Sequence, residues 1–244
     1  MTAKYILYQP YKWLIFAPLM LVITLLTALL SASTSMIFSS RVGNFIGSCW
    51  ARVTCWMFSR PWITPVSVFI KGRENIEPGK SYVIVSNHQS IWDIFLLYGN
   101  MPIDFRWVMK KELRTIPFVG YACEKVGHIF IDRSSPREAA RSLEEARKKL
   151  VNGVSVVIFP EGTRSRRKEM NRFKNGAFKL ARDLELDILP VTIVDSYKIC
   201  SGDFLDLMPG RAGIVIHPVI KTADYIDSQQ ELSDHARQII ESAL

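Results

Sequence analysis

Residues 82–93 read Tyr-Val-Ile-Val-Ser-Asn-His-Gln-Ser-Ile-Trp-Asp, an apolar run that breaks into polar residues and then turns apolar again. The run from Tyr82 to Ser86 predicts a strand, and the stretch from Ser90 to Tyr98 predicts a helix. The residues between them then form a short turn. A strand that leads through a turn into a helix is a repeating unit of α/β proteins.

Six other runs also predict strands, and they lie at Val66 to Lys71, Phe105 to Met109, Gly127 to Ile131, Val154 to Phe159, Ile188 to Val194 and Gly213 to Ile220. Helical patterns separate several of them, most clearly from Pro136 to Asn152. This order predicts an α/β fold with a largely parallel, mixed sheet flanked by helices. Ligands of such sheets bind at the carboxyl ends of the strands.

The N-terminal region is apolar, and no charged residue occurs from Trp13 to Ser40. About 20 helical residues cross a hydrocarbon core of roughly 30 Å, so residues 1–61 are expected to form one or two membrane-anchoring helices. The change in pattern after Pro61 assigns residues 62–244 to the α/β domain. A cleaved signal peptide is the alternative, and the length of the run disfavours it.

Basic residues stand on both sides of the apolar run, so they do not choose between a single span and a hairpin that enters and leaves one face. In the hairpin, Ser31 to Ser35 would form the bend. Met36 to Phe58 would then form a second helix near the membrane interface.

The chain has 244 residues, with 31 Lys and Arg against 23 Asp and Glu, and a formal charge of +8. Basic residues concentrate between positions 106 and 174, which predicts a surface for a polyanion, although a solvated helical face could carry part of this charge. No recognised nucleic-acid module accompanies them, so no nucleic-acid partner is expected. The four cysteines match no zinc or redox spacing.

His88 and Asp93 are five residues apart, a spacing that would separate them by about 140° on a continuous helix. They can meet only if His88 lies in the turn and Asp93 in the first helical turn. A carboxylate that fixes one ring nitrogen leaves the other as a proton acceptor, which is general-base chemistry on a hydroxyl or water. The alternative is that Ser90 and Asp93 form a capping box and His88 is an ordinary turn residue.

A second motif, Phe-Pro-Glu-Gly-Thr-Arg-Ser at residues 159–165, follows an apolar strand. Gly162 lets backbone amides approach an anion, and Arg164 offers a planar donor fork, so the motif predicts a phosphate site. The alternative is a solvated loop whose basic side chains only meet water. Lys110 and Arg133 add cations at two other strand or loop ends. Pro190 suggests an edge, a bulge or a ligand-facing bend in its strand.

Four ordered blocks over about residues 62–220 resemble the glycerolipid acyltransferase family, most closely its 1-acyl-sn-glycerol-3-phosphate (lysophosphatidic acid) acyltransferases. The first block, Asn-His-x-Ser-x-x-Asp, is met by Asn87, His88, Ser90 and Asp93. The second is met by Lys110, Glu112, Leu113, Pro117, Gly120, Gly127 and residues 131–133, the third by residues 159–165, and the fourth by residues 189–191.

The resemblance implies transfer of a fatty acyl group from a thioester, acyl-CoA or acyl carrier protein, to the sn-2 hydroxyl of lysophosphatidic acid, giving phosphatidic acid without a cofactor or metal. His88 would act as general base and Asp93 would orient it. Ser90 should cap the helix, so no acyl-enzyme is expected. The backbone of Glu161, Gly162 and Thr163 would assist Arg164, Lys110 and Arg133 in holding the phosphate, with Asn87, Ser90 and Pro190 in supporting positions.

The expected location is a membrane, the inner or cytoplasmic one, with the catalytic domain on the cytoplasmic face and membrane lipid as a partner. One alternative function is acylation of glycerol 3-phosphate or another lysophospholipid. A membrane-bound phosphohydrolase could instead use His88, Asp93 and Glu161, with or without a metal. A third reading is a non-catalytic membrane scaffold that binds anionic lipid.

Overall fold

The computed structural model describes residues 3–58, 67–132, 153–200, 202, 206–208, 210–225 and 228–244. The helix expected at 136–152 and the candidate phosphate ligand Arg133 lie outside these ranges. The junction at 59–66 also lies outside them, so the division into residues 1–61 and 62–244 stays a prediction.

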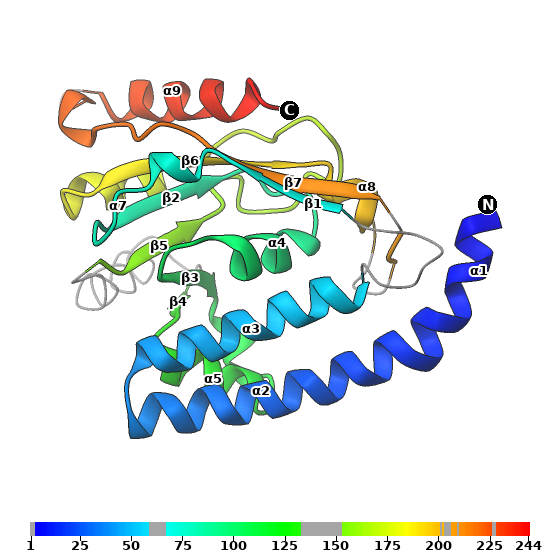
Figure 1. Ribbon diagram of the computed structural model, residues 1–244. Helices are drawn as coiled ribbons and strands as arrows, with labels where there is room; N and C mark the ends of the chain where they lie inside the picture. Colours follow the sequence, from blue (N-terminus) through cyan, green and yellow to red (C-terminus); the bar gives the residue numbers. More distant parts are fainter. Residues whose placement is uncertain are drawn as a thin grey trace.

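A seven-stranded sheet forms the centre of the molecule, in the order β1-β7-β6-β2-β5-β3-β4 (Figure 1). The strands are β1 (Ser67–Lys71), β2 (Tyr82–Ser86), β3 (Phe105–Lys110), β4 (Ile129–Ile131), β5 (Ser155–Ile158), β6 (Asp187–Val194) and β7 (Arg211–Ile216). All neighbours pair in parallel except β6 and β7, which are antiparallel. The predicted largely parallel, mixed sheet and its seven strands are confirmed, with small shifts at the strand ends.

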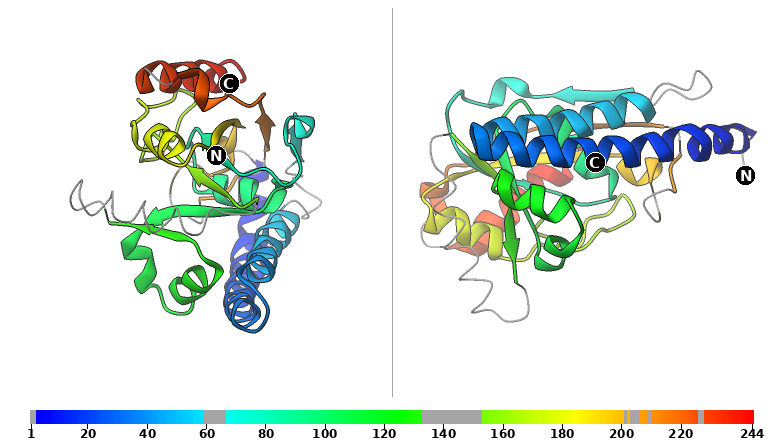
Figure 2. Two further views of the ribbon diagram at one scale, coloured as in Figure 1. Left: turned by 90° about the vertical axis from the view of Figure 1, so that its left-hand side faces the viewer. Right: turned by 90° about the horizontal axis from the view of Figure 1, so that it is seen from below.

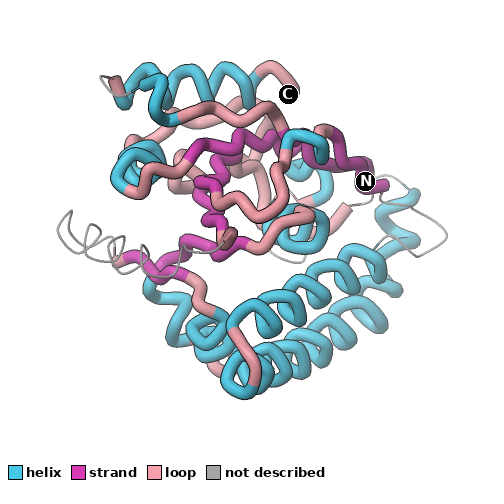
Figure 3. The backbone as a smooth tube through the Cα atoms, turned by 60° about the vertical axis from the view of Figure 1, so that its left-hand side comes forward, coloured by secondary structure: helices cyan, strands magenta, loops and turns pink. Residues whose placement is uncertain are grey.

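The alternation of side chains along β2 builds a core on each face of the sheet. Tyr82 and Ile84 join a cluster with α4 (Trp92–Asn100), while Val83 and Val85 join a second cluster with α7 (Gly176–Asp183) and α9 (Gln229–Glu241). Successive strand residues point to opposite faces, so an apolar run without alternation is what a sheet covered on both sides requires. The strands accordingly form one layer between helices (Figure 3).

The N-terminal region is a helical hairpin that lies against the α4 side of the sheet (Figure 2). Its first arm joins α1 (Ala3–Tyr11), the π-helical turn η1 (Lys12–Phe16) and α2 (Ala17–Ile37), and its second arm is α3 (Ser40–Phe58). α2 also packs against α5 (Val119–Val126). Shorter elements are η2 (Arg73–Asn75), η3 (Lys111–Thr115), α8 (Ser196–Ile199) and η4 (Thr222–Tyr225).

The bend of the hairpin lies at Phe38 and Ser39, so the expected bend at Ser31 to Ser35 was wrong. α2 continues through these small polar residues. Thr34 Oγ1 bonds to Leu30 O of the helix at 2.7 Å, whereas the hydroxyls of Ser31 and Ser35 are buried without a hydrogen-bond partner among the described residues. The segment instead lets the two arms come close. A Cβ at Gly43 of α3 would lie 2.6 Å from the carbonyl oxygen of Ser31.

The two sides of the hairpin differ in burial. Tyr8, Phe16 and Met57 are buried in the same cluster as Trp92 and Ile84 of the sheet domain. By contrast, the helix from Ile6 to Ile37 is long and apolar enough to cross a membrane, and only 22% of its most apolar window is buried. A helix of a soluble core would be mostly buried, so this exposed apolar surface indicates membrane association.

Candidate active site

The parallel strands bring the two sequence motifs to one edge of the sheet. Val85 of β2 pairs with Ile158 of β5, so His88 and Glu161, each three residues further on, leave the sheet at the same level. The two loops touch at this point, because the backbone N–H of His88 donates to Oε1 of Glu161 at 2.7 Å. The carboxyl edge of the sheet is therefore where the motifs meet, as expected for an α/β fold.

His88 and Asp93 make direct contact at the start of α4. Nδ1 of His88 lies 2.7 Å from Oδ2 of Asp93, and the same oxygen accepts the backbone N–H groups of Gln89 and Ser90 at 2.7 and 2.9 Å. Asp93 is fully buried. Its other oxygen, Oδ1, has no hydrogen-bond partner among the described residues. The carboxylate is an acceptor, so it assigns the proton to Nδ1 and leaves Nε2 as the lone-pair nitrogen.

The imidazole of His88 is further held by stacking. The ring of Phe159, from the second motif, lies parallel to it with 4.0 Å between centroids and 9° between planes. The side chain of His88 remains 16% exposed, and within the described ranges Nε2 has no hydrogen-bond partner. Phe159 was part of the quoted motif, but its position before a Pro-Glu-Gly turn does not by itself predict stacking on a histidine.

The side chains of Asn87 and Ser90 form hydrogen bonds with the backbone of neighbouring segments. The amide of Asn87 bonds both polar groups of Ile193, donating to its carbonyl at 2.9 Å and accepting from its N–H at 2.7 Å. The hydroxyl of Ser90 donates to Cys200 O at 2.7 Å and accepts from the N–H of Trp92 at 3.1 Å. Both side chains are almost completely buried. The N-cap residue of α4 is Ile91, which has no side-chain cap, so the expected capping role of Ser90 is met only by its bond to the N–H of Trp92, the first residue of the helix.

Glu161 ties the second loop to the first. Its Oε1 accepts from His88, and its Oε2 accepts from the backbone N–H of Asn171 at 2.7 Å. The two loops are also joined by backbone bonds from Ser165 N to His88 O and from Arg166 N to Gln89 O. Burial raises the pKa of Glu161, while the two backbone donors lower it. The carboxylate is thus used inside the protein, and only the backbone of this residue remains for a phosphate.

The basic side chains that were predicted to bind phosphate make fewer contacts within the protein. Arg164 is half-buried, and its guanidinium makes no hydrogen bond or ion pair with the described residues. Burial raises the pKa of the Cys200 thiol to about 11, and the charge of Arg164 opposes this shift, which places the guanidinium near the segment that binds Ser90. Lys110 is exposed at the end of β3, and Thr163 is exposed in the second loop. The structure does not place Arg133.

Pro190 lies in the interior of the sheet, buried, where it pairs with Val85. The expectation of an edge strand was therefore wrong. Its carbonyl accepts from the N–H of His217, one residue beyond the end of β7 at Ile216. Antiparallel pairing continues past this point, because Ile188 and Ile220 exchange both backbone hydrogen bonds. Val191 pairs with Ile216 but Ile188 pairs with Ile220, so the segment after β7 has one extra residue opposite Pro190, as in a bulge.

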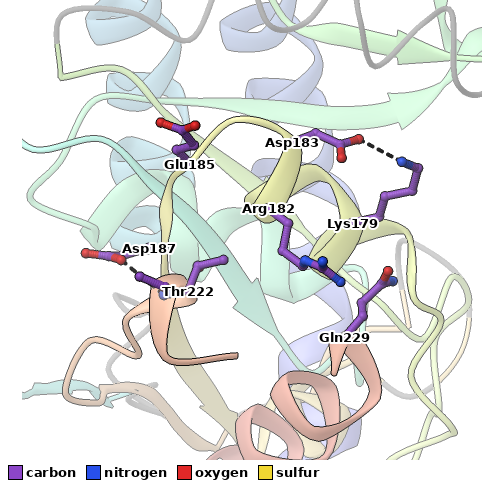
Figure 4. Close-up of a pocket in the computed structure, with 8 residues that line it drawn as sticks. Lys179, Arg182, Asp183, Glu185, Asp187, Thr222 and Gln229 are labelled. Atoms are coloured by element: carbon purple, nitrogen blue, oxygen red, sulfur yellow. Dashed lines mark hydrogen bonds and ion pairs between the residues drawn. The ribbon is translucent and has the colours of Figure 1, made fainter. Parts of the chain in front are cut away.

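Pockets also lie away from these loops. Figure 4 shows a polar pocket of about 590 Å³ at the start of β6, the opposite end from the motifs, and it is lined by Lys179, Arg182, Asp183, Glu185, Asp187, Thr222, Ala223 and Gln229. An apolar pocket of about 90 Å³ lies between the hairpin, α4 and α5. Aromatic rings connect it to His88, because Phe159 stacks on Trp107 and Trp107 meets Tyr98 at the pocket wall.

Comparison with known proteins gives a consistent result. Residues 67–194 match the family model described as Acyltransferase. A 1-acyl-sn-glycerol-3-phosphate acyltransferase of Chlamydomonas reinhardtii is 34% identical over 206 residues, which cover 82% of this chain and 58% of the algal protein. One from Borreliella burgdorferi is 30% identical over 70% of this chain and 68% of its own length. The chain spans about half the length of several such relatives.

The crystal structure of the 1-acyl-sn-glycerophosphate (LPA) acyltransferase PlsC from Thermotoga maritima has the same architecture. It is 25% identical in sequence, superimposes with a TM-score of 0.69, and the match covers 94% of this chain and 96% of that one. The family match lies on the sheet and both motif loops, where His88, Asp93 and Arg164 are found. The chain therefore belongs to the acyltransferase family.

Proposed function

We propose that the protein transfers a fatty acyl group from a thioester of coenzyme A or acyl carrier protein to the sn-2 hydroxyl of 1-acyl-sn-glycerol 3-phosphate, forming phosphatidic acid. The observation that carries this proposal is the contact between His88 and the fully buried Asp93 at the edge where both motif loops meet. The names of the relatives support lysophosphatidic acid as the acceptor.

In the proposed reaction, Nε2 of His88 takes the proton of the acceptor hydroxyl while its oxygen attacks the thioester carbonyl carbon. The carbon–sulfur bond then breaks, and the imidazolium returns the proton to the departing thiolate. Asp93 stays ionised and stabilises the imidazolium through Oδ2. The backbone amides of Gln89, Ser90 and Trp92 are already bonded within the first loop, which favours donors on the second loop for the developing oxyanion.

Transfer is direct in this proposal. A nucleophilic serine needs a neighbouring base that accepts its proton. The hydroxyl of Ser90 instead donates to Cys200 O, and the carboxylate and imidazole nearby bond to each other. No acyl-enzyme is therefore expected.

Arg164 holds the phosphate of the acceptor, with the backbone at residues 161–163 and with Lys110 at the neighbouring strand end. Two observations support this role. Neither Arg164 nor Lys110 has a side-chain partner among the described residues, and Gly162, in the same loop as Arg164, has a φ of +74°. Arg133 remains a predicted third cation. The expectation that the reaction uses no metal or cofactor is also still a prediction.

The hairpin delivers lipid substrate to this edge. Its exposed apolar side chains continue onto η3 and the start of α5, where Leu113, Ile116, Phe118 and Tyr121 are exposed. We place this surface in the membrane, on the cytoplasmic face of the inner or cytoplasmic membrane, with the catalytic domain outside the hydrocarbon. The apolar pocket beside the hairpin receives part of an acyl chain, since an aromatic series links it to His88.

The test is incubation of the purified full-length chain with labelled acyl-CoA or acyl carrier protein and several acceptors, followed by product identification. Phosphatidic acid from lysophosphatidic acid is the expected product. Preferred acylation of glycerol 3-phosphate or of a headgroup-bearing lysophospholipid would show that lysophosphatidic acid is not the main acceptor. Release of inorganic phosphate would indicate a phosphohydrolase, and lipid binding without turnover would indicate a scaffold.

A further inference from the structure

Lys174 lies directly across the glycine of the second loop. A Cβ built on Gly162 would stand 2.9 Å from Nζ and 3.2 Å from Cε of Lys174. The lysine side chain therefore runs along the bare backbone of Gly162. A side chain at this position would displace it, in addition to the strain of a φ of +74°.

Backbone bonds fix this approach. The N–H of Lys174 donates to Pro160 O at 2.9 Å, and three residues earlier the N–H of Asn171 donates to Oε2 of Glu161 at 2.7 Å. The other oxygen of Glu161 holds the backbone of His88. The segment 171–174 is thus attached to the same carboxylate as the loop that carries the proposed base.

The charge of Lys174 is not neutralised within the described part of the chain. The side chain is exposed and makes no hydrogen bond or ion pair there, and the carboxylate of Glu161 is buried with both oxygens on backbone amides. Lys179, five residues further on, shows the contrast, since its Nζ pairs with Asp183 at 2.9 Å. Arg164 likewise has no hydrogen bond or ion pair with the residues that the structure describes, and its backbone lies at most about 7 Å from that of Gly162.

We propose that Lys174 binds a phosphate monoester of a substrate, together with Arg164, over the backbone of Gly162. A phosphate monoester carries a charge near −1.5 to −2 at neutral pH, so two cations suit it better than one. This inference rests on the proposed function. The acceptor phosphate and the 3′-phosphate of coenzyme A share this chemistry, and the experiment below separates them.

The test compares Lys174→Met, which keeps an apolar stem, with Lys174→Arg and with the matched control Lys179→Met. Steady-state kinetics are measured with lysophosphatidic acid and with 1-acylglycerol as acceptors, and with acyl-CoA and acyl-pantetheine as donors. Lys174→Met should raise KM about ten-fold for a substrate that carries the phosphate, equivalent to about 1.4 kcal/mol. It should change kcat less than about two-fold, Lys174→Arg should recover most of the affinity, and Lys179→Met should behave like the wild type.

A rise in KM confined to lysophosphatidic acid assigns the site to the acceptor, and one confined to acyl-CoA assigns it to the donor. Unchanged KM for both, or equal changes for the phosphate-free substrates, would overturn the proposal. If the wild-type chain forms no product, the proposed function fails. Lys174 is then judged by titration of lysophosphatidic acid and, separately, of coenzyme A into the detergent-solubilised protein, where equal affinity of wild type and Lys174→Met for both would overturn the inference by itself.

Discussion

The two loops at the carboxyl edge of the sheet use their polar groups in opposite ways. In the first loop, residues 87–93, the side chains of Asn87, Ser90 and Asp93 are all bonded inside the protein. In the second loop, residues 159–166, Glu161 is bonded internally, whereas Thr163 is exposed and Arg164 has no side-chain partner among the described residues.

This difference separates two requirements of a transferase. A base must be held in one orientation before the substrate arrives, and buried hydrogen bonds provide that rigidity. Cations that recognise a phosphate must instead keep their donors for the ligand. Substitutions in the first loop should therefore lower kcat or stability, and substitutions of the outward side chains of the second should raise KM.

The largest expected effect is that of His88→Ala. Loss of a general base lowers turnover by roughly 10²–10⁴, and we expect kcat to fall by this factor with little change in thermal unfolding. The control is His235→Ala, which removes a histidine of α9 that bonds Tyr225 on another part of the protein. A folded His88→Ala variant with a near-normal rate would mean that the first loop is not the catalytic one.

Ser90→Ala should mainly affect stability. It removes the hydroxyl that bonds the buried carbonyl of Cys200 and the N–H of Trp92, so the free energy of unfolding should fall by about 1–3 kcal/mol. Denaturant unfolding measures this loss. Because the hydroxyl is not the nucleophile in the proposed mechanism, kcat should fall far less than in His88→Ala, and mass spectrometry of the wild type should detect no acylated serine. A trapped acyl-Ser90 adduct would contradict direct transfer.

The sequence predicted the sheet well because its strands are continuous apolar runs, and a strand buried on both faces needs that pattern. It also predicted that His88 and Asp93 meet, since only a turn followed by a helix permits their spacing. It did not predict the bend at Phe38 and Ser39, because hydroxyls such as that of Thr34 are satisfied within α2. The interior place of Pro190 depends on the extra residue in the segment after β7, which is a property of another part of the chain.

Contacts between distant segments were least accessible from the sequence. Glu161 was expected to contribute to a phosphate site, and nothing in its motif indicates that the carboxylate bonds His88 and Asn171 instead. The position of Lys174 over Gly162 likewise depends on a backbone bond from Lys174 to Pro160. Pro160 lies fourteen residues earlier in the chain, a separation that no helical spacing predicts to be a contact.

Arg164→Ala should raise KM for lysophosphatidic acid about ten-fold, because a charge-assisted contact to phosphate contributes roughly 1.5–3 kcal/mol. The value of kcat at saturating acceptor should change less. Arg182→Ala is the matched control, since Arg182 is also half-buried but lines the pocket at the opposite end of the strands. An equal loss with 1-acylglycerol would show that Arg164 supports the fold or the donor site, which would remove the distinction between the loops.

The smallest expected effect concerns the pH dependence of stability and tests the internal role of Glu161. Burial raises the pKa of this carboxyl above its ordinary value of 4.5, so the folded state binds its proton more tightly than the unfolded state does. Stability from this group is therefore complete below about pH 4.5 and declines as the pH rises through the folded-state value.

Glutamine at this position does not titrate, so the unfolding free energy of the wild type minus that of Glu161→Gln should decrease with rising pH above 4.5. The absolute stability of Glu161→Gln is a poorer measure. The side-chain NH₂ of glutamine would face one of the two backbone N–H groups that now donate to Glu161, and two donors cannot bond to each other. Chemical denaturation of both proteins from pH 4 to pH 7 provides the comparison. A difference that stays constant or grows with pH would mean that Glu161 is ionised at least as readily in the folded chain as in the unfolded one.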